Sequence, residues 1–201
     1  MTLHTVILAA GSSQRFFGIK QLAEIKGLSL LEHTINCYKT ALGYLAQRAA
    51  FTIVVGANQN KIIAAVGQHI ECYYAPNWSL GMGHSLADFI KNVAPTSTHV
   101  LVGLADQIAL QSEDIQRLIK VHQEFPEAII SARYNNVVGA PCIFPRSYYI
   151  HLSELRGDKG AKSVLEHFAN HVVTVDIPNA QFDVDTPEDF KKAKSLAQFK
   201  A

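Results

Sequence analysis

The chain has 201 residues, and its 18 Lys and Arg nearly balance 17 Asp and Glu, for a formal net charge of +1. This length predicts one domain over residues 1–201 with a substantial core, and a hydrophobic content of 48% argues against disorder. The near-neutral charge excludes broad attraction of nucleic acid, so an anionic ligand would need local basic residues.

The cysteines and the N-terminus bear on the compartment. Cys37, Cys72 and Cys142 are widely spaced and form no CxxC pair, which predicts reduced, buried thiols rather than a disulfide framework or a metal site. The N-terminus lacks the charged and apolar regions of a signal peptide, and no apolar run is long enough to span a bilayer. The expectation is a cytoplasmic protein with no membrane partner.

Apolar runs alternate with amphipathic segments along the chain. The apolar runs predict strands at 5–10, 49–56, 70–75, 98–105, 128–134, 140–145 and 171–177. The amphipathic segments predict helices at about 29–46, 58–67, 83–93, 112–124, 160–169 and 187–198. This alternation predicts an α/β fold, a three-layer α/β/α sandwich around a mostly parallel sheet.

The loops after the strands are the candidate site, because ligands of an open parallel sheet bind outside the carboxyl ends of its strands. These loops are 11–20, 76–85, 106–111 and 183–186. The Gly- and Pro-containing stretch 134–160 breaks the alternation of strands and helices, and we expect it to cover the edge of the sheet where the carboxyl ends of the strands lie.

The first loop lies in "ILAAGSSQRFFGIKQL", residues 7–22. Gly11 would let a phosphate approach the backbone, Arg15 could fork onto phosphate oxygens, and Lys20 adds a point charge. The loop is not a P-loop, because Phe16 stands where the second glycine of that motif belongs. On these residues alone, a phosphate site and a plain strand-to-helix turn remain nearly equal alternatives.

Aspartates follow two later parts of the chain. Asp106 ends the strand of "VLVGLADQ", and Ser112 is the expected cap of the next helix, so Asp106 is not needed there. In "FDVDTPEDF", Thr186 followed by proline predicts a helix start, which leaves Asp183 or Asp185 free to face the ligand. Two such carboxylates suit Mg²⁺ bound to substrate phosphates, whereas the alternative is a solvated acidic turn.

The segment "APNWSLGMGHSL" contains two glycines near a helix start. It fails as a dinucleotide fingerprint, because Leu86 fills the third glycine position. Either its glycines let the backbone approach a flat ligand and Ser85 bonds a base edge, or it is an ordinary helix N-terminus with Trp78 as a core anchor.

Five blocks together resemble one family. "LAAGSSQRFFGIKQL" resembles the signature LAAG-x-S-x-R-M-G-x-x-K of the MobA-like nucleotidyltransferases, most closely the molybdenum cofactor cytidylyltransferases. "NWSLGMGHSL", the DQ of "LADQ", "FDVDTPED" and the pair "GAPCIF" and "LRGDKGAK" also match, in the right order, from residue 4 to about 190. Phe16 and Phe17 replace the usual Met-Gly, Ile108 replaces a proline, and Lys162 replaces an arginine.

The resemblance implies a role for each matching residue. It implies that Asp106 and Asp185 hold Mg²⁺, with Asp183 as a weaker candidate, and that Arg15, Lys20 and Asp106 are catalytic. The nucleotide would be bound by Leu8, Ala9, Ala10, Gly11, Ser12, Ser13, Arg15, Lys20, Gly81, Met82 and Ser85. The region 139–162 would line the acceptor site, and His84 has no matched role.

The implied reaction is transfer of CMP from CTP to the terminal phosphate of a molybdopterin-type acceptor, with release of pyrophosphate. Ala9 and Ala10 before the first glycine resemble the members that use CTP rather than GTP. The alternatives are a guanylyltransferase for the same cofactor, a sugar-phosphate or sugar-acid nucleotidyltransferase, and a non-catalytic nucleotide-binding partner of a molybdoenzyme. A molybdoenzyme is also the possible recipient of the product.

Overall fold

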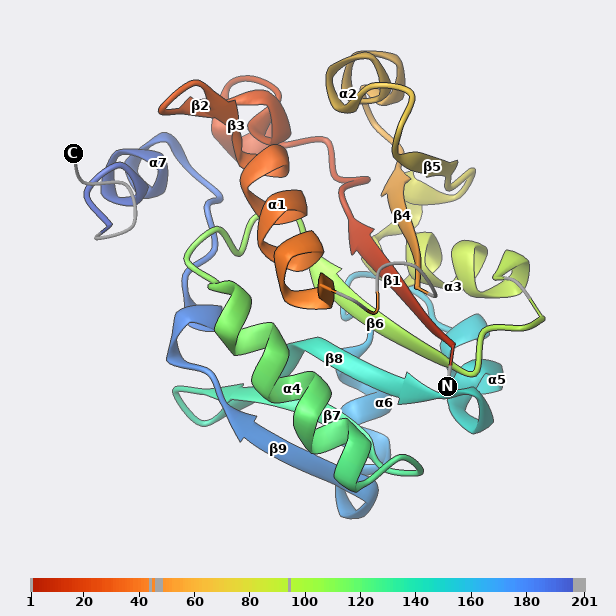
Figure 1. Ribbon diagram of the computed structural model, residues 1–201. Coiled ribbons are helices and arrows are strands. Elements are labelled where there is room, and N and C mark those ends of the chain that lie inside the picture. Colours follow the sequence, from red (N-terminus) through yellow and green to blue (C-terminus); the bar gives the residue numbers. More distant parts are fainter. Residues whose placement is uncertain (1, 44, 46–48, 94, 197–201) are drawn as a thin grey trace.

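The computed structural model describes residues 2–43, 45, 49–93 and 95–196. Its main sheet has seven strands in the order β5-β4-β1-β6-β8-β7-β9 (Figure 1). Their bounds are β1 Leu3–Leu8, β4 Ala50–Val55, β5 Glu71–Tyr74, β6 His99–Leu104, β7 Ile129–Tyr134, β8 Val137–Pro145 and β9 Val172–Asp176. Strands β2 (Glu24–Ile25) and β3 (Leu28–Ser29) form a separate small hairpin.

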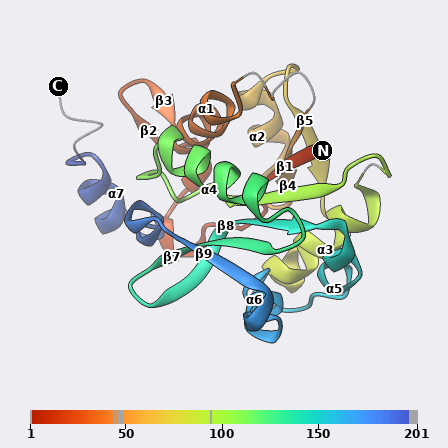
Figure 2. The same cartoon turned by 60° about the horizontal axis from the view of Figure 1, so that its bottom comes forward.

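Helices cover both faces of the sheet. They are α1 Leu30–Leu42, α2 Gln59–Val66, α3 Met82–Asn92, α4 Ser112–Glu124, α5 Tyr149–Ser153, α6 Lys162–His167 and α7 Pro187–Ala193. Figure 2 shows the sheet between α1 and α4 on one side and α3, α5 and α6 on the other. The predicted three-layer α/β/α arrangement is therefore confirmed.

The alternation of side chains along β1 divides the core in two. Leu3 and Ile7 pack in a cluster with α1 and α4, whereas Val6 and Leu8 pack in a cluster with α3, α5 and α6. All six residues of β1 are buried, as expected for a central strand of a parallel sheet that is covered on both faces. A third cluster forms beneath α7.

One strand departs from the parallel pattern. β8 runs antiparallel to both β6 and β7, and the other neighbouring pairs of the main sheet are parallel. The stretch 134–160 was expected to cover the carboxyl-end edge of the sheet, but its residues 137–145 form a strand inside the sheet. This strand contains the one predicted at 140–145. The chain can place it there because β7 and β8 are joined by the short turn at Asn135 and Asn136, both with positive φ.

The predicted element boundaries need small corrections. α1 ends at Leu42 and α7 at Ala193, earlier than predicted, and the predicted positions 44, 46, 197 and 198 lie outside the described residues. α6 is also shorter than predicted, and β8 begins three residues earlier. Helix α4 begins at Ser112 itself, because Gln111 is its N-cap and donates its backbone N–H to Asp114 at 3.0 Å.

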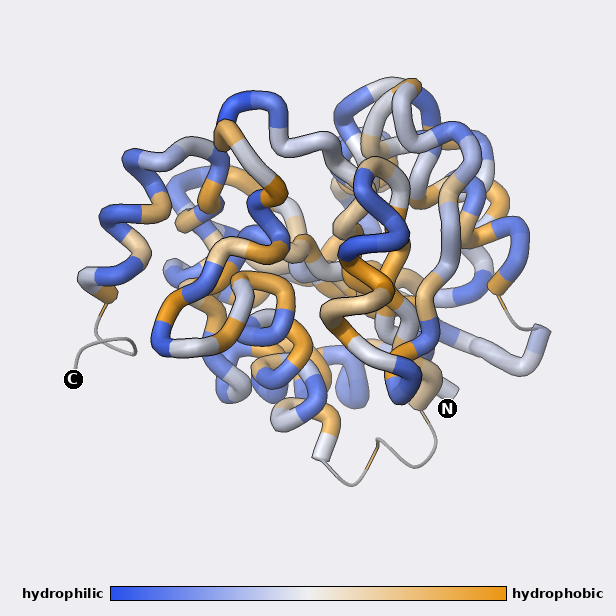
Figure 3. The backbone as a smooth tube through the Cα atoms, turned by 90° about the horizontal axis from the view of Figure 1, so that it is seen from above, coloured by the Kyte–Doolittle hydropathy of each residue, from blue (hydrophilic) through white to orange (hydrophobic). Residues whose placement is uncertain are grey.

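The loops of the candidate site lie at one edge of the sheet, beyond the carboxyl ends of the strands. The carboxyl ends of β1, β4 and β6 meet at the top of the molecule in Figure 1, and Figure 3 views it from that side. Hydrophobic and hydrophilic segments are interleaved along the chain there, as expected for elements that each bury one face. No helix in the described ranges is long and apolar enough to cross a membrane.

Candidate active site

A cavity of about 620 Å³ opens at the carboxyl-end edge of the sheet. This volume is typical of small-molecule sites, which span about 300–1,000 Å³. Every residue predicted to bind nucleotide or metal lines it except the weaker metal candidate Asp183; the lining ones are Leu8, Ala9, Ala10, Gly11, Ser12, Ser13, Arg15, Lys20, Gly81, Met82, Ser85, Asp106 and Asp185. The structure therefore brings the four separate loops together, while the roles of these residues remain predictions.

The first loop is held by its own polar side chains. Buried Gln21 donates from Nε2 to the carbonyl oxygens of Ala9 at 3.0 Å and Gly11 at 3.1 Å. Ser13 Oγ donates to Gln21 Oε1 at 3.0 Å and accepts from the backbone N–H of Lys20 at 3.3 Å. Gln21 was missed by the sequence reasoning, because nothing in its pattern separates a buried loop glutamine from a solvated one.

The two phenylalanines of this loop have different environments. The Phe16 ring packs edge-on against Phe190 of α7, with 5.6 Å between ring centroids. Phe17 is 93% exposed and has a φ of 56°, a left-handed conformation that is unusual for a bulky residue. The departure from Met-Gly thus anchors one aromatic ring to α7 and leaves the next in solvent.

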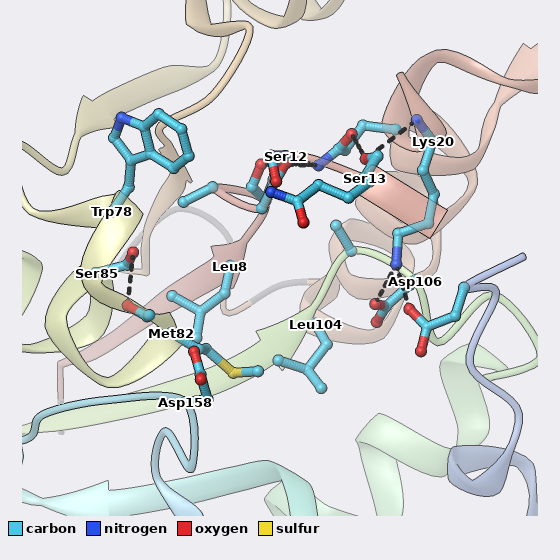
Figure 4. A pocket seen from close by; sticks show the side chains of 18 of the residues that line it. Leu8, Ser12, Ser13, Lys20, Trp78, Met82, Ser85, Leu104, Asp106 and Asp158 are labelled. Atoms are coloured by element: carbon cyan, nitrogen blue, oxygen red, sulfur yellow. Dashed lines mark hydrogen bonds and ion pairs between the residues drawn. The ribbon is translucent and has the colours of Figure 1, made fainter. Parts of the chain in front are cut away.

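The polar end of the cavity holds a four-residue ion cluster. Lys20 Nζ lies 2.8 Å from Asp106 Oδ2 and 2.9 Å from Asp185 Oδ1. Arg15 reaches the other oxygen of Asp185 at 2.8 Å. Lys20, predicted to hold phosphates, thus bridges the two carboxylates predicted to hold metal (Figure 4).

Burial and charge act in opposite directions on this cluster. Burial alone would lower the pKa of Lys20, but Asp106 and Asp185 outweigh it and the pKa is raised. Burial alone would raise the pKa of Asp185, but Lys20 and Arg15 hold it below its usual range. Lys20 and Asp185 are therefore both charged near neutral pH.

Asp183 differs from Asp185. Burial, followed by repulsion from Asp106 and Asp185, raises the pKa of Asp183 to about 7. Asp183 is not among the residues that line the cavity, unlike Asp185. The weaker metal candidacy of Asp183 stays a prediction.

Backbone contacts explain why Asp106 and Asp185 meet. Val184 donates its N–H to the carbonyl oxygen of Asp106 at 3.1 Å. The fully buried Gln107 donates from Nε2 to Ala180 at 2.8 Å and to Ala140 at 3.1 Å, which fastens the loop after β6 to two other segments. Gln107 is a second positioning residue that the sequence reasoning missed.

The start of α7 matches its sequence pattern. Thr186 Oγ1 accepts from the backbone N–H of Asp189 at 3.2 Å, and Asp189 Oδ2 accepts from the backbone N–H of Thr186 at 3.0 Å. This reciprocal pair is a capping box, with Pro187 at the first helical position. The cap leaves the Asp185 side chain free for the cavity, as predicted.

The other end of the cavity has no cationic side chain among the lining residues described. Figure 4 shows Trp78 and Ser85 on one side of the cavity and Lys20 and Asp106 on the other. Gly56 at the end of β4 makes room for the indole, because a Cβ there would lie 2.5 Å from Trp78 Cβ. Trp78 is both a packing residue and part of the cavity wall, while base binding by this segment stays a prediction.

The arrangement has a clear chemical character. A strand-to-helix loop, two cationic side chains and two carboxylates converge at one end, and Trp78, Met82, Ser85 and Asp158 lie away from them in the cavity. The model of the MobA-like NTP transferase domain matches residues 5–175. The chain belongs to this family.

Individual relatives support the same assignment. The chain is 25% identical to the purine catabolism protein PucB of Bacillus subtilis (strain 168) over 201 residues, with 92% of each chain covered. It is also similar to the crystal structure of Rv0371c from Mycobacterium tuberculosis H37Rv, with a TM-score of 0.79, 26% identity and 98% of each chain covered. A manganese complex of Rv0371c matches with a TM-score of 0.73 and 25% identity over 96% of this chain and 97% of that one.

Membership of the MobA-like family makes the chain a nucleotidyltransferase. The enzyme class is thus established, and the non-catalytic alternative is set aside. The matched range contains Asp106 and the first loop, whereas Asp185 and the capping box lie beyond its end at residue 175.

Proposed function

We propose that this nucleotidyltransferase is a CTP:molybdenum cofactor cytidylyltransferase. It transfers CMP to the terminal phosphate of a molybdopterin-type acceptor and releases pyrophosphate. The observation that carries the proposal is the convergence of Arg15, Lys20, Asp106 and Asp185 at one end of a single cavity. The choice of CTP and of this acceptor rests on the sequence resemblance.

Arg15 and Lys20 are the groups for the triphosphate. The Arg15 side chain is 72% exposed, so its ion pair with Asp185 is weak and the guanidinium can turn to phosphate oxygens. The Lys20 side chain is only 13% exposed, and this burial strengthens the electric field of its ammonium at a bound phosphate. Both charges offset the negative charge that builds up on departing pyrophosphate.

Asp106 and Asp185 are the metal-binding carboxylates of the proposal. Asp106 Oδ1 is buried and has no hydrogen-bond partner within the described part of the chain, so it has a free coordination position. Those same ranges contain no group of three or more His, Cys, Asp and Glu side chains arranged to hold a metal. Two carboxylates, completed by phosphate oxygens and water, fit the preference of Mg²⁺.

A bound divalent ion would neutralise phosphate charge and orient the α-phosphate. Manganese in the Rv0371c complex supports a divalent ion in this fold, and Mg²⁺ is our proposal for this chain. Lys20 now lies between the two carboxylates, so its ammonium must turn toward the phosphates when the ion binds.

The remaining lining residues hold the nucleoside. The backbone of Leu8, Ala9, Ala10, Gly11, Ser12 and Ser13 faces the sugar and phosphates, and Gly81, Met82 and Ser85 face the base. The Ala10 side chain narrows the space beside the base, which favours a pyrimidine. Figure 4 shows Trp78 and Lys20 on opposite sides of the cavity, so we propose that the base binds toward Trp78 and the triphosphate toward Lys20.

The reaction is an in-line displacement without a covalent enzyme intermediate. An oxygen of the acceptor's terminal phosphate forms a bond to the α-phosphorus, and the bond from that phosphorus to the α–β bridging oxygen breaks. The leaving pyrophosphate takes the electron pair and remains on Arg15 and Lys20. Positioning and charge neutralisation supply most of the rate enhancement, as in other phosphoryl transfers.

The deciding experiment measures pyrophosphate release with the molybdenum cofactor, Mg²⁺ and each of the four NTPs, with sugar phosphates as alternative acceptors. We expect turnover with CTP and the molybdenum cofactor. Preference for GTP, or turnover only with a sugar phosphate, would overturn the assignment of substrate.

Asp106→Ala should abolish turnover by removing a metal-binding carboxylate. Asp176→Ala is the matched control, because this exposed carboxylate pairs with Arg133 at the end of β9 and is not among the cavity-lining residues. Near-normal activity of Asp106→Ala would contradict the proposed metal site.

A further inference from the structure

The loop 156–158 lies directly on the first turn of α3. Gly83 donates its backbone N–H to the carbonyl oxygen of Gly157 at 2.7 Å, and Gly157 donates its N–H to His84 Nδ1 at 3.1 Å. A Cβ on Gly83 would lie 2.8 Å from the carbonyl oxygen of Arg156. The contact therefore requires glycine at position 83, and the two hydrogen bonds, one donated by the helix and one by the loop, hold the loop against the helix.

The hydrogen bonds of Gly157 fix the position of the next residue, Asp158. The Asp158 carboxylate lines the cavity, and its Oδ1 lies only 2.5 Å from where a Cβ on Gly81 would stand. Gly81 has a φ of 115°, so both its backbone conformation and this close approach exclude larger residues. Figure 4 shows Asp158 beside Met82, on a different side of the cavity from the pair Lys20 and Asp106.

The charge of Asp158 limits what it can bind. In the described part of the chain its carboxylate takes part in no hydrogen bond or ion pair, so its acceptor positions are open. A triphosphate would be repelled by a carboxylate, whereas an amino group would be attracted to it. Carboxylates commonly accept from the exocyclic amino group of cytosine, and any amino-bearing heterocycle offers the same donor.

We infer that Asp158 is a specificity-determining residue that accepts a hydrogen bond from an amino group of the substrate heterocycle, and that His84 is its positioning residue. This inference rests on the proposed nucleotidyl transfer. The donor is the amino group of either the nucleotide base or the pterin of the acceptor. His84 acts by holding the Gly157 amide, which sets the direction of the next side chain.

The role of His84 depends on a single ring nitrogen. Nδ1 accepts from Gly157 only when the proton is on Nε2. The carbonyl oxygen of Leu80 lies 3.0 Å from the same nitrogen and would be bonded only by a protonated Nδ1. An asparagine can place its Oδ1 close to the position of Nδ1, so His84→Asn retains an acceptor that His84→Ala lacks.

The first test measures binding by wild type and Asp158→Asn, with Asp176→Asn as the control. Trp78 is the single tryptophan of the chain and lines the cavity, so its fluorescence reports binding. CTP alone and the molybdenum cofactor alone are titrated separately. We expect about 10- to 100-fold weaker binding of the ligand that supplies the amino group, the range for one charge-assisted hydrogen bond.

The two arms identify the source of the donor. Weaker binding of CTP assigns it to the base, and weaker binding of the molybdenum cofactor assigns it to the pterin. Wild-type binding of both ligands by Asp158→Asn would overturn the inference. These titrations need no turnover, so they remain decisive even if the proposed transfer reaction fails for every acceptor.

The second test separates positioning from a purely structural role. His84→Ala should weaken binding of the ligand affected by Asp158→Asn about 3- to 10-fold, raise KM for that substrate and leave kcat nearly unchanged. His84→Asn should bind the same ligand within about twofold of wild type. If His84 acts through Asp158, adding His84→Ala to Asp158→Asn should weaken binding no further. The positioning role of His84 would be overturned if the losses of affinity of the two single variants multiplied in the double variant, or if His84→Asn bound as weakly as His84→Ala.

Discussion

Replacing Lys20 by methionine should lower stability and activity while strengthening the binding of a divalent ion. The change removes the ammonium that lies 2.8 Å from Asp106 and 2.9 Å from Asp185 and keeps the length of the side chain. The two carboxylates then face each other, and of the described side chains only Arg15 still pairs with one of them. Their mutual repulsion is the source of the expected loss.

The size of the loss follows from burial. Breaking a buried ion pair costs about 3–5 kcal/mol, whereas exposed pairs contribute about 0.2–1 kcal/mol. Lys20 is 13% exposed, Asp106 24% and Asp185 35%, so the cluster lies between these limits. We expect Lys20→Met to lower the free energy of unfolding by about 1–3 kcal/mol, or Tm by about 3–10 °C for a chain of this length.

The assay is thermal unfolding of wild type and Lys20→Met in chelator and in excess Mg²⁺ or Mn²⁺. The ion should raise the Tm of Lys20→Met more than that of wild type, because it no longer competes with the ammonium. Pyrophosphate release should nevertheless fall by orders of magnitude, since the phosphates lose their cation. Lys61→Met, an exposed lysine on α2, is the control.

Two results would refute this reasoning. An unchanged Tm in chelator would show that Lys20 is not needed to offset the two carboxylates. An equal or smaller shift of the variant's Tm with the ion would show that the ion does not occupy the space between Asp106 and Asp185.

Three further predictions concern the first loop, the base end and the core. Phe17→Gly should raise the free energy of unfolding by about 1 kcal/mol in urea titrations, because glycine adopts the left-handed conformation of this exposed position at lower cost than phenylalanine. Phe16→Ala should lower the free energy of unfolding, because it removes the ring contact with Phe190. Equal effects of the two variants would contradict this difference. Gly81→Ala should weaken CTP binding at least about 10-fold in fluorescence titrations, since its Cβ would collide with 157–158; wild-type affinity would contradict the close approach. Burial, reinforced by a neighbouring histidine, lowers the pKa of fully buried His122 to about 4. The unfolded chain therefore binds this proton first as the pH falls below about 6.5, and stability should drop by about 2–3 kcal/mol by pH 4, a drop that His122→Phe should remove. Identical pH profiles in urea would contradict the assignment to this side chain.

The amino-acid sequence by itself determined the elements and the loops that carry the site. Apolar runs and amphipathic periods depend on local order along the chain, so strands such as β1 and β6 and the capped start of α7 could be predicted within a few residues. The rule that ligands bind at the carboxyl ends of parallel strands then selected the loops that line the cavity.

The tertiary structure decided which side chains meet. The insertion of β8 between β6 and β7 depends on pairing between segments far apart in the sequence, which no local pattern encodes. The same holds for Gln21 and Gln107, whose roles come from buried carbonyl oxygens brought to them by folding.

The opposite sides of the ion cluster show the difference most clearly. Lys20 and Asp185 are separated by 165 residues, and each was assigned to a different ligand from its own neighbours in the sequence. Only the folded sheet brings the loops of Lys20, Asp106 and Asp185 together. The ammonium therefore lies 2.8 and 2.9 Å from the two carboxylates only when all three loops are in place. Local sequence therefore specified the charges, and the fold specified their partners.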